Sequence, residues 1–184
     1  TAPPQSINHG CDYDYPITWS DPDGDNVTFT WERLDDNLGW LGVQPNGILS
    51  GTPSESYIGE TGDMILTITD DRPNASDSTV FSFSISVGRN FPPEFTDSSS
   101  VDTTAIVGVL YEAQFPVDDQ NSDNVTVTST LPDWLDIQTT TSTYEIFGTP
   151  DSVDVGTHDV TITAEDECGA SRSFEFSIEV SESE

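Results

Sequence analysis

The chain has 184 residues, enough for one or two domains, and its 34 acidic residues outnumber four basic ones, giving a formal net charge of −30. This charge argues against nucleic acids and anionic membranes as partners, and no apolar run is long enough to cross a membrane. Bound calcium or high external salt would reduce the repulsion between the carboxylates, and both occur outside the cytosol. We therefore expect an extracellular protein that belongs to a longer polypeptide.

Alternating apolar and polar residues predict strands along the first half of the chain. The pattern covers Tyr13–Trp19, Val27–Trp31, residues 64–69 and Thr79–Val87. An alternation of period two is typical of a strand with one buried and one solvated face. A disordered acidic segment is the alternative, but it would lack such regular β-branched and aromatic runs.

The second half shows the same alternation and no helical pattern. Apolar residues alternate with polar ones over residues 160–164 and 174–180. Serine, threonine, valine and isoleucine dominate the composition, which favours strands over helices. The sequence therefore predicts an all-β protein made of two tandem Greek-key sandwiches of the cadherin or immunoglobulin type.

Five sequence landmarks occur once in each half and in the same order. An acidic loop that runs into Asn-Val-Thr is followed by Trp-Leu, then by Gly-Thr-Pro, and then by two strand patterns. Two prolines in residues 88–95 favour an extended, stiff linker at the point where the repeat begins again. The repeat predicts two domains, residues 1–89 and 90–184.

These landmarks resemble a known family. Asp-Pro-Asp-Gly-Asp at 21–25, Trp-Leu at 40–41, Gly-Ile-Leu-Ser-Gly-Thr-Pro at 47–53 and Asn-x-Pro-Pro-x-Phe at 90–95 are similar to the dystroglycan-type cadherin-like domain. The resemblance covers both halves, although the second lacks Asp-x-Asp-Gly-Asp. The resemblance implies calcium at the domain junction. The chain also resembles the double cadherin-like unit with which some bacterial repeats-in-toxin adhesins bind peptides.

The acidic loops are the predicted calcium sites, because Ca²⁺ binds six to eight oxygens that come largely from carboxylates. In a sandwich of this topology, the loop between strands B and C and the loop between F and G lie at the same end. The predicted ligands are Asp21, Asp23, Asp25, Asp70 and Asp71 in the first domain, and Asn90, Asp118, Asp119, Asp123, Asp166 and Glu167 at the junction and in the second. Solvated turns are the alternative, since Asp and Asn favour turns anyway.

The two cysteines, Cys11 and Cys168, fall one in each predicted domain, and both are expected near the linker. An extracellular setting permits a disulfide between them, which would close a loop of more than half the chain. Two free thiols, or a pairing with another molecule, are the alternatives.

No catalytic motif is recognisable, so we expect a protein that is not an enzyme. The functional hypothesis is a calcium-dependent module of a bacterial surface adhesin, monomeric by itself, that binds a peptide or protein on another cell. A calcium-stiffened spacer and a carbohydrate-binding accessory module, with a glycan as ligand, are the alternatives. Aromatic residues are common anchors at interfaces. The candidate ligand-binding residues are Tyr13, Tyr15, Trp31 and Tyr57.

Overall fold

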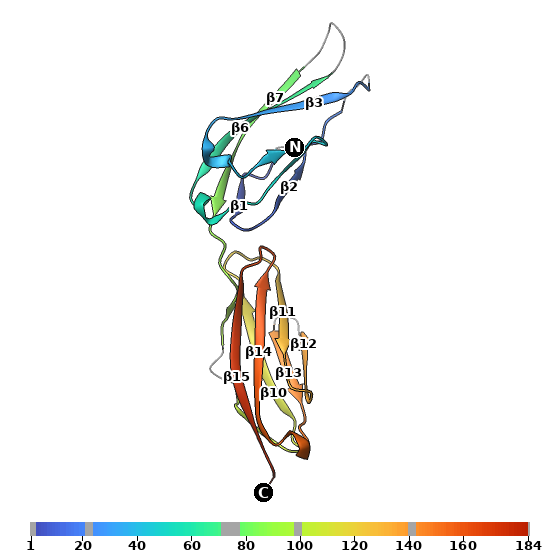
Figure 1. The fold of residues 1–184 in the computed structure, drawn as a ribbon, viewed down its shortest axis with the longest axis vertical. Coiled ribbons are helices and arrows are strands. Elements are labelled where there is room, and N and C mark those ends of the chain that lie inside the picture. The colour runs from blue at the N-terminus through green and yellow to red at the C-terminus, as the bar shows by residue number, and fades with distance from the viewer. Residues whose placement is uncertain (1–2, 21–23, 71–77, 98–100, 140–142, 184) are drawn as a thin grey trace. The chain divides into compact units, whose positions relative to one another are not determined.

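The computed structural model describes residues 3–20, 24–70, 78–97, 101–139 and 143–183. The chain divides into two compact units, Thr1–Asn90 and Phe91–Glu184. The described residues form strands and three short 3₁₀ helices, η1 (Asp36–Leu38), η2 (Glu55–Tyr57) and η3 (Ser152–Asp154), so the predicted all-β class is confirmed (Figure 1). None of the described helices is long and apolar enough to span a membrane.

The first unit packs two sheets face to face. One sheet has the order β1 (Ser6–Asn8), β7 (Ser78–Gly88), β6 (Thr61–Asp70), β3 (Val27–Arg33). The other has the order β2 (Tyr13–Pro16), β5 (Ile48–Gly51), β4 (Gly42–Val43). All neighbours are antiparallel except β1 and β7, which run parallel.

The second unit repeats this plan with one more strand. One sheet has the order β11 (Val125–Thr130), β14 (Gly156–Asp166), β15 (Ser171–Ser181), β9 (Thr104–Ile106). The other has the order β12 (Leu135–Thr139), β13 (Thr143–Gly148), β10 (Tyr111–Asp118), β8 (Glu94–Phe95). Here β9 and β15 are the parallel pair. Strand β8 has no counterpart in the described part of the first unit.

Each unit has its own apolar core between its two sheets. The alternating residues predicted from the sequence supply part of it, and other strands and η1 supply the rest; each fully buried side chain contributes roughly 1.5–3 kcal/mol. The fully buried side chains include Leu38, Leu49, Met64 and Ile85 in the first unit, and Phe115, Ile146, Ile162 and Ile178 in the second.

The repeated Trp-Leu and Gly-Thr-Pro landmarks lie against each other in both units. A Cβ atom added to Gly51 would overlap the backbone carbonyl of Trp40, and one added to Gly148 would overlap that of Trp134. No side chain fits at this close approach of two backbone segments. The glycine of Gly-Thr-Pro is therefore a packing requirement of the sandwich.

A buried tyrosine ties the start of each unit to its core. The hydroxyl of Tyr13 donates to the carbonyl of Pro4 at 2.9 Å, and that of Tyr111 donates to the carbonyl of Asp102 at 2.6 Å. Burial raises the pKa of both tyrosines to about 12. Both side chains thus stay neutral and able to donate over the physiological pH range.

Candidate metal site and apolar cavity

Three carboxylates of the second unit converge at one end of the sandwich. Asp119 follows β10, Asp123 precedes β11, and Asp166 is the last residue of β14. The register of β11 on β14 places Val125 opposite Asp166, which brings the two loops together. One carboxylate oxygen from each of the three aspartates lies within 4.8 Å of the others.

The backbone of its own loop fixes Asp119. Its Oδ1 accepts hydrogen bonds from the N–H groups of Asn121 (2.8 Å) and Asp123 (3.1 Å). Ser122 has a φ of 65°, a left-handed conformation that tightens the loop between these donors. The other oxygen, Oδ2, is buried and has no hydrogen-bond partner among the described residues, and the residue is only 7% exposed. A buried carboxylate oxygen without a partner is costly unless a cation binds it.

The backbone of the β14–β15 turn fixes Asp166 in the same way. Its Oδ1 accepts from the N–H groups of Cys168 (2.9 Å) and Ala170 (2.8 Å), and the residue is 5% exposed. Neither buried aspartate can therefore turn away from the group without losing two backbone hydrogen bonds. The three carboxylates form a preorganised cluster of oxygens.

The electrostatics of the cluster disfavour a third negative charge. Burial raises the pKa of Asp123 above its ordinary value, and the carboxylates of Asp119, Glu167 and Asp166 raise it further. Either a proton or a cation relieves this repulsion. Three carboxylates supply up to six oxygens, which matches the ligand chemistry of Ca²⁺.

Two other predicted ligands of this unit lie outside the group of three. Asp118 is the last residue of β10, is exposed, and pairs with Glu94 of β8. Glu167 is also exposed, and its carboxylate accepts a hydrogen bond from the side-chain amide of Asn124 at 3.0 Å. Glu167 adds negative charge near the cluster. Asp118 is exposed, so removing its charge provides a surface control for the same change at Asp119.

The predicted ligands of the first unit are described only in part. Asp70 ends β6 opposite Val27 and so occupies the position that Asp166 has in the second unit. Asp25 and Asp70 are half-buried. Asn90 is buried, and its backbone N–H donates to Nδ1 of His9 at 2.8 Å. Asp21, Asp23 and Asp71 lie outside the described residues.

Each cysteine occupies a turn of its own unit. Cys11 is buried after β1, where its N–H donates to the carbonyl of Asn8 at 3.3 Å. Cys168 lies in the β14–β15 turn, with its Sγ 3.8 Å from Oδ2 of Asp123. The disulfide between the two cysteines stays a prediction.

The four candidate ligand-binding aromatics have different surroundings. Tyr13 is buried and meets Trp40 edge to face, with ring centroids 5.9 Å apart. Trp31 is 38% exposed, and the Arg33 guanidinium carbon lies 5.0 Å from its ring centroid. Tyr57 is half-buried in η2. Tyr15 lines a mostly apolar cavity, and Trp31 lines a second, more open hollow beside Val43 and Pro45.

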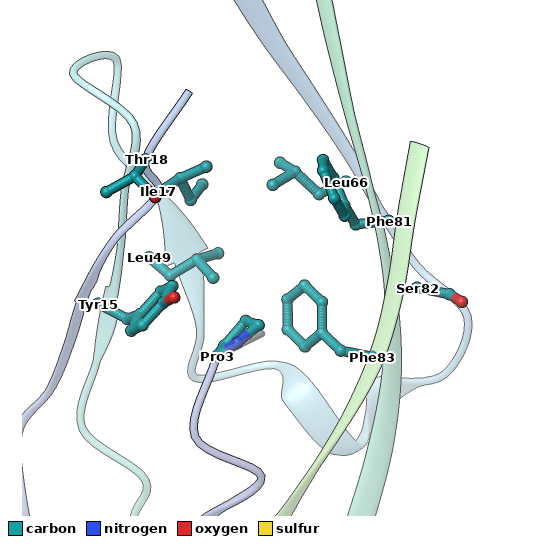
Figure 2. Close-up of a pocket in the computed structure, with 9 residues that line it drawn as sticks. All are labelled: Pro3, Tyr15, Ile17, Thr18, Leu49, Leu66, Phe81, Ser82 and Phe83. Atoms are coloured by element: carbon teal, nitrogen blue, oxygen red, sulfur yellow. The ribbon is translucent and has the colours of Figure 1, made fainter. Parts of the chain in front are cut away.

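That cavity lies between the two sheets of the first unit (Figure 2). Its volume is about 220 Å³, and its lining is mostly apolar. The lining residues are Pro3, Tyr15, Ile17, Thr18, Leu49, Leu66, Phe81, Ser82 and Phe83. Sequence reasoning missed this site because its residues follow the ordinary alternation of core positions.

Comparison with known proteins supports the fold. Residues 92–181 match the family model described as "Putative Ig domain". No curated protein matches the chain. A solved structure of titin domains I67–I69, an E-to-A variant, has a TM-score of 0.50 and 15% identity, and covers 96% of this chain. The Ig-like sandwich predicted from the sequence is thus confirmed as a fold.

Two further solved structures are similar at lower scores. The endo-fucoidan hydrolase MfFcnA4 has a TM-score of 0.40, 23% identity and 100% coverage of this chain. Protocadherin gammaB7 EC3-6 has a TM-score of 0.41, 20% identity and 97% coverage. The chain spans 28% of the hydrolase, 62% of the titin fragment and 45% of the protocadherin fragment. At these scores and identities, neither resemblance bears on function.

Proposed function

We propose that this chain is a calcium-binding adhesion module of an extracellular bacterial protein, which binds a peptide or protein ligand and catalyses no reaction. One observation carries the metal part of the proposal: Asp119, Asp123 and Asp166 converge within 4.8 Å, two of them buried. The unpartnered Oδ2 of Asp119 marks where a cation would bind.

Calcium fits these residues better than a transition metal does. The three converging ligands are all carboxylates, and hard oxygen ligands suit Ca²⁺, whereas zinc and copper favour nitrogen and sulfur. Magnesium demands near-ideal octahedral geometry and dehydrates reluctantly, so a partly buried set of rigid carboxylates favours the larger ion. The ion would neutralise the repulsion that raises the pKa of Asp123 and would hold the β10–β11 loop against the β14–β15 turn.

The extracellular location rests on charge. A net charge of −30 without any lysine suits a medium that is rich in calcium or salt, because both reduce the repulsion between carboxylates. Tandem Ig-like sandwiches with acidic loops also fit a repeats-in-toxin type of surface adhesin, the family of proteins suggested by the sequence landmarks.

An oxidising environment also permits the predicted bridge between Cys11 and Cys168, which belongs to the same proposal. Peptide mapping of unreduced protein should recover the two cysteine-containing peptides joined, and a thiol reagent should find no free sulfhydryl. Two titratable thiols in freshly purified protein would remove the bridge from the proposal and leave the calcium site untouched.

Calorimetric titration of chelator-treated protein with calcium tests the metal site, and thermal melts with and without calcium follow its effect on stability. We expect saturable binding and a higher Tm, because a ligand that binds only the folded state stabilises it. A peptide display screen with and without chelator tests the ligand. Calcium binding without any ligand would identify a spacer, and the absence of both would refute the proposed function.

A further inference from the structure

The two units differ at the side of the sandwich where β3 and β4 are the edge strands of their sheets. Trp31 and Ser129 occupy the same position, because Trp31 pairs with Leu66 of β6 as Ser129 pairs with Ile162 of β14. Trp31 lies on the core-facing side of β3, in phase with the half-buried Phe29, yet it is 38% exposed. A large aromatic side chain thus stands partly in solvent where the second unit has a small polar one.

The hairpin that faces β3 also differs between the units. In the second unit Tyr144 of β13 closes this side, because its hydroxyl donates to the carbonyl of Val125 on β11 at 3.2 Å. Gly47 is the corresponding residue of the first unit, since the N–H of Ile17 donates to its carbonyl where Phe115 of β10 pairs with Tyr144. Gly47 has no side chain that could reach β3, so the gap between the two sheets stays open here.

This gap is the hollow that Trp31 lines, and its volume is about 360 Å³. Val27, Thr28, Phe29 and Trp31 line it from β3, and Val43, Gln44 and Pro45 line it from β4 and the turn that follows. None of these residues is charged, although the chain has 34 acids. Strand β5 lies between β4 and β2, so a further strand beside β2 would not cover the hollow.

Arg33 holds the indole of Trp31 in place. Its guanidinium carbon lies 5.0 Å from the centroid of the indole ring, and its Nη1 donates to the carbonyls of Leu38 (3.2 Å) and Gly39 (3.1 Å). Arg33 does not line the hollow, so it occupies one side of the indole while another side faces the hollow. The ring is thus fixed before a ligand arrives, which lowers the entropy cost of binding.

Two polar side chains lie beside this aromatic surface. The Nε2 of Gln44 donates to Oγ of Ser50 at 3.1 Å, which orients the amide. The hydroxyl of Thr28 donates to the carbonyl of Thr69 at 3.2 Å, and its oxygen retains lone pairs that can accept. A side-chain amide and a hydroxyl group each donate and accept hydrogen bonds, so they suit a ligand that carries several hydroxyl groups.

We propose that this hollow binds a neutral pyranose unit of a glycan, with the C–H face of the sugar ring stacked on the indole of Trp31 and its hydroxyl groups bonded to Gln44 and Thr28. A sugar ring has apolar faces and a polar rim, and this pair of surfaces matches a tryptophan flanked by an amide and a hydroxyl group. The inference goes beyond the proposed function, because it adds a sugar site that uses neither the calcium cluster nor the peptide ligand.

Charge and size select this ligand class. An uncharged lining favours an uncharged ligand, and the net charge of −30 on the chain repels sulfated or carboxylated sugars. Pockets for small molecules have volumes of about 300–1,000 Å³. A hollow of about 360 Å³ is at the lower end of that range, which suits one sugar ring and not a helix or strand of a protein.

The test uses the full chain in calcium and a printed array of oligosaccharides that contains neutral, uronic-acid and sulfated sequences. The strongest neutral oligosaccharide is then titrated into isotope-labelled protein, and NMR of the indole and side-chain amide N–H groups locates the contact. We expect neutral oligosaccharides to bind, acidic ones not to bind, and the signals of the Trp31 indole and the Gln44 amide to shift.

Variants separate this site from the rest of the surface. Trp31→Ala should lower the affinity by about tenfold or more, because truncating an aromatic anchor removes at least that factor. Gln44→Ala should lower it by about fivefold, which corresponds to one hydrogen bond, and it alters only an exposed side chain if Trp31→Ala fails to fold. Gln138→Ala, the corresponding change in the second unit, should leave the affinity unchanged.

Four outcomes would overturn the inference. They are no binding of any neutral oligosaccharide on the array, a preference for acidic ones, equal binding by the Gln44→Ala and Gln138→Ala variants, and loss of binding in chelator while thermal melts show that the chain is folded. The last result would assign the sugar to a bound metal ion.

Failure of this site is distinguishable from failure of the proposed function. If no glycan binds but the chain still binds calcium and a peptide from the display screen, only the present inference is wrong. If such a peptide shifts the Trp31 indole signal and displaces the glycan, the hollow belongs to the peptide site, and the glycan inference is again wrong while the peptide-binding function stands.

Discussion

Asp119 and Asp118 are neighbours in sequence but differ in burial and in hydrogen bonding. Two backbone N–H groups hold one oxygen of Asp119, and its other oxygen is buried without a partner among the described residues. Asp118 is exposed to solvent at the end of β10. The pair therefore offers a test in which formal charge is removed equally at a proposed ligand and at a surface position.

Asp119→Asn should lower calcium affinity by about tenfold or more, because Ca²⁺ affinity depends on the number of carboxylate ligands. Asp118→Asn should change it by less than about threefold, since an exposed charge acts only through a screened field. Calorimetric titration of both variants measures the difference. Equal losses in the two would mean that general acidity, and not this cluster, attracts the ion.

The buried tyrosines predict a stability loss in alkaline solution. Folding raises the pKa of Tyr13 and Tyr111 from 10.0 to about 12, so the folded state retains their protons where the unfolded state releases them. Their contribution is complete below pH 10 and is lost as the pH rises from 10 toward 12. Urea unfolding at pH 8 and pH 11 should show this decline.

The Tyr13→Phe/Tyr111→Phe double variant should be less stable at pH 8, by about 1 kcal/mol per lost hydrogen bond. Its stability should then fall less between pH 8 and pH 11 than that of the parent chain, because the phenylalanines do not titrate. If the stability of both proteins depended on pH in the same way, other groups would be responsible for the loss of stability in alkaline solution.

At the scale of strands and turns, the glycine of Gly-Thr-Pro has a structural role that its recurrence alone does not explain. Gly148→Ala should destabilise the second unit by several kcal/mol, since its Cβ would overlap the backbone of Trp134 and a strand would have to move. Gly42→Ala provides the comparison, because its Cβ would meet only the carbonyl of Ser50 at 3.9 Å. Thermal melts of the two variants should separate clearly, and similar Tm values would mean that the sandwich adapts.

Strand positions followed from the sequence where alternation was regular. The pattern over Thr79–Val87 corresponds to β7, and the pattern that begins at Val27 corresponds to β3, which continues to Arg33. The strand predicted over Tyr13–Trp19 is shorter and covers Tyr13–Pro16, although the N–H of Ile17 still donates to the carbonyl of Gly47. Alternation reports which face of a strand is apolar, and it says nothing of how far the partner strand extends.

The sequence predicted the two candidate sites to different degrees. Loops at one end of a sandwich bring their acids together, so the topology could indicate Asp119, Asp123 and Asp166. It could not distinguish them from Asp118 or Glu167, because that depends on which carboxylates the loop backbone turns inward. The cavity beside Phe81 is lined by residues that follow the ordinary alternation of core positions, so no sequence pattern marked it.

For the molecule as a whole, net charge should govern stability when calcium is removed. Raising sodium chloride from about 0.1 M to 1 M shortens the Debye length from roughly 10 Å to 3 Å, so the Tm of the chelated chain should rise by several degrees. The same salt step at pH 4 should have a smaller effect, because many of the 34 acidic residues are then protonated. Equal increases in Tm at both pH values would point to a general effect of salt on the burial of apolar surface.

The parallel pairing at the ends of each unit has a mechanical consequence. Ser6–Asn8 runs alongside Ser86–Gly88 in the first unit, and Thr104–Ile106 runs alongside Glu179–Ser181 in the second. When the two ends of a unit are pulled apart, such a parallel pair is loaded along the strand axis, so its hydrogen bonds share the load instead of opening one after another. A single-molecule stretching experiment should therefore find that each unit resists tension and unfolds in one step at its parallel pair.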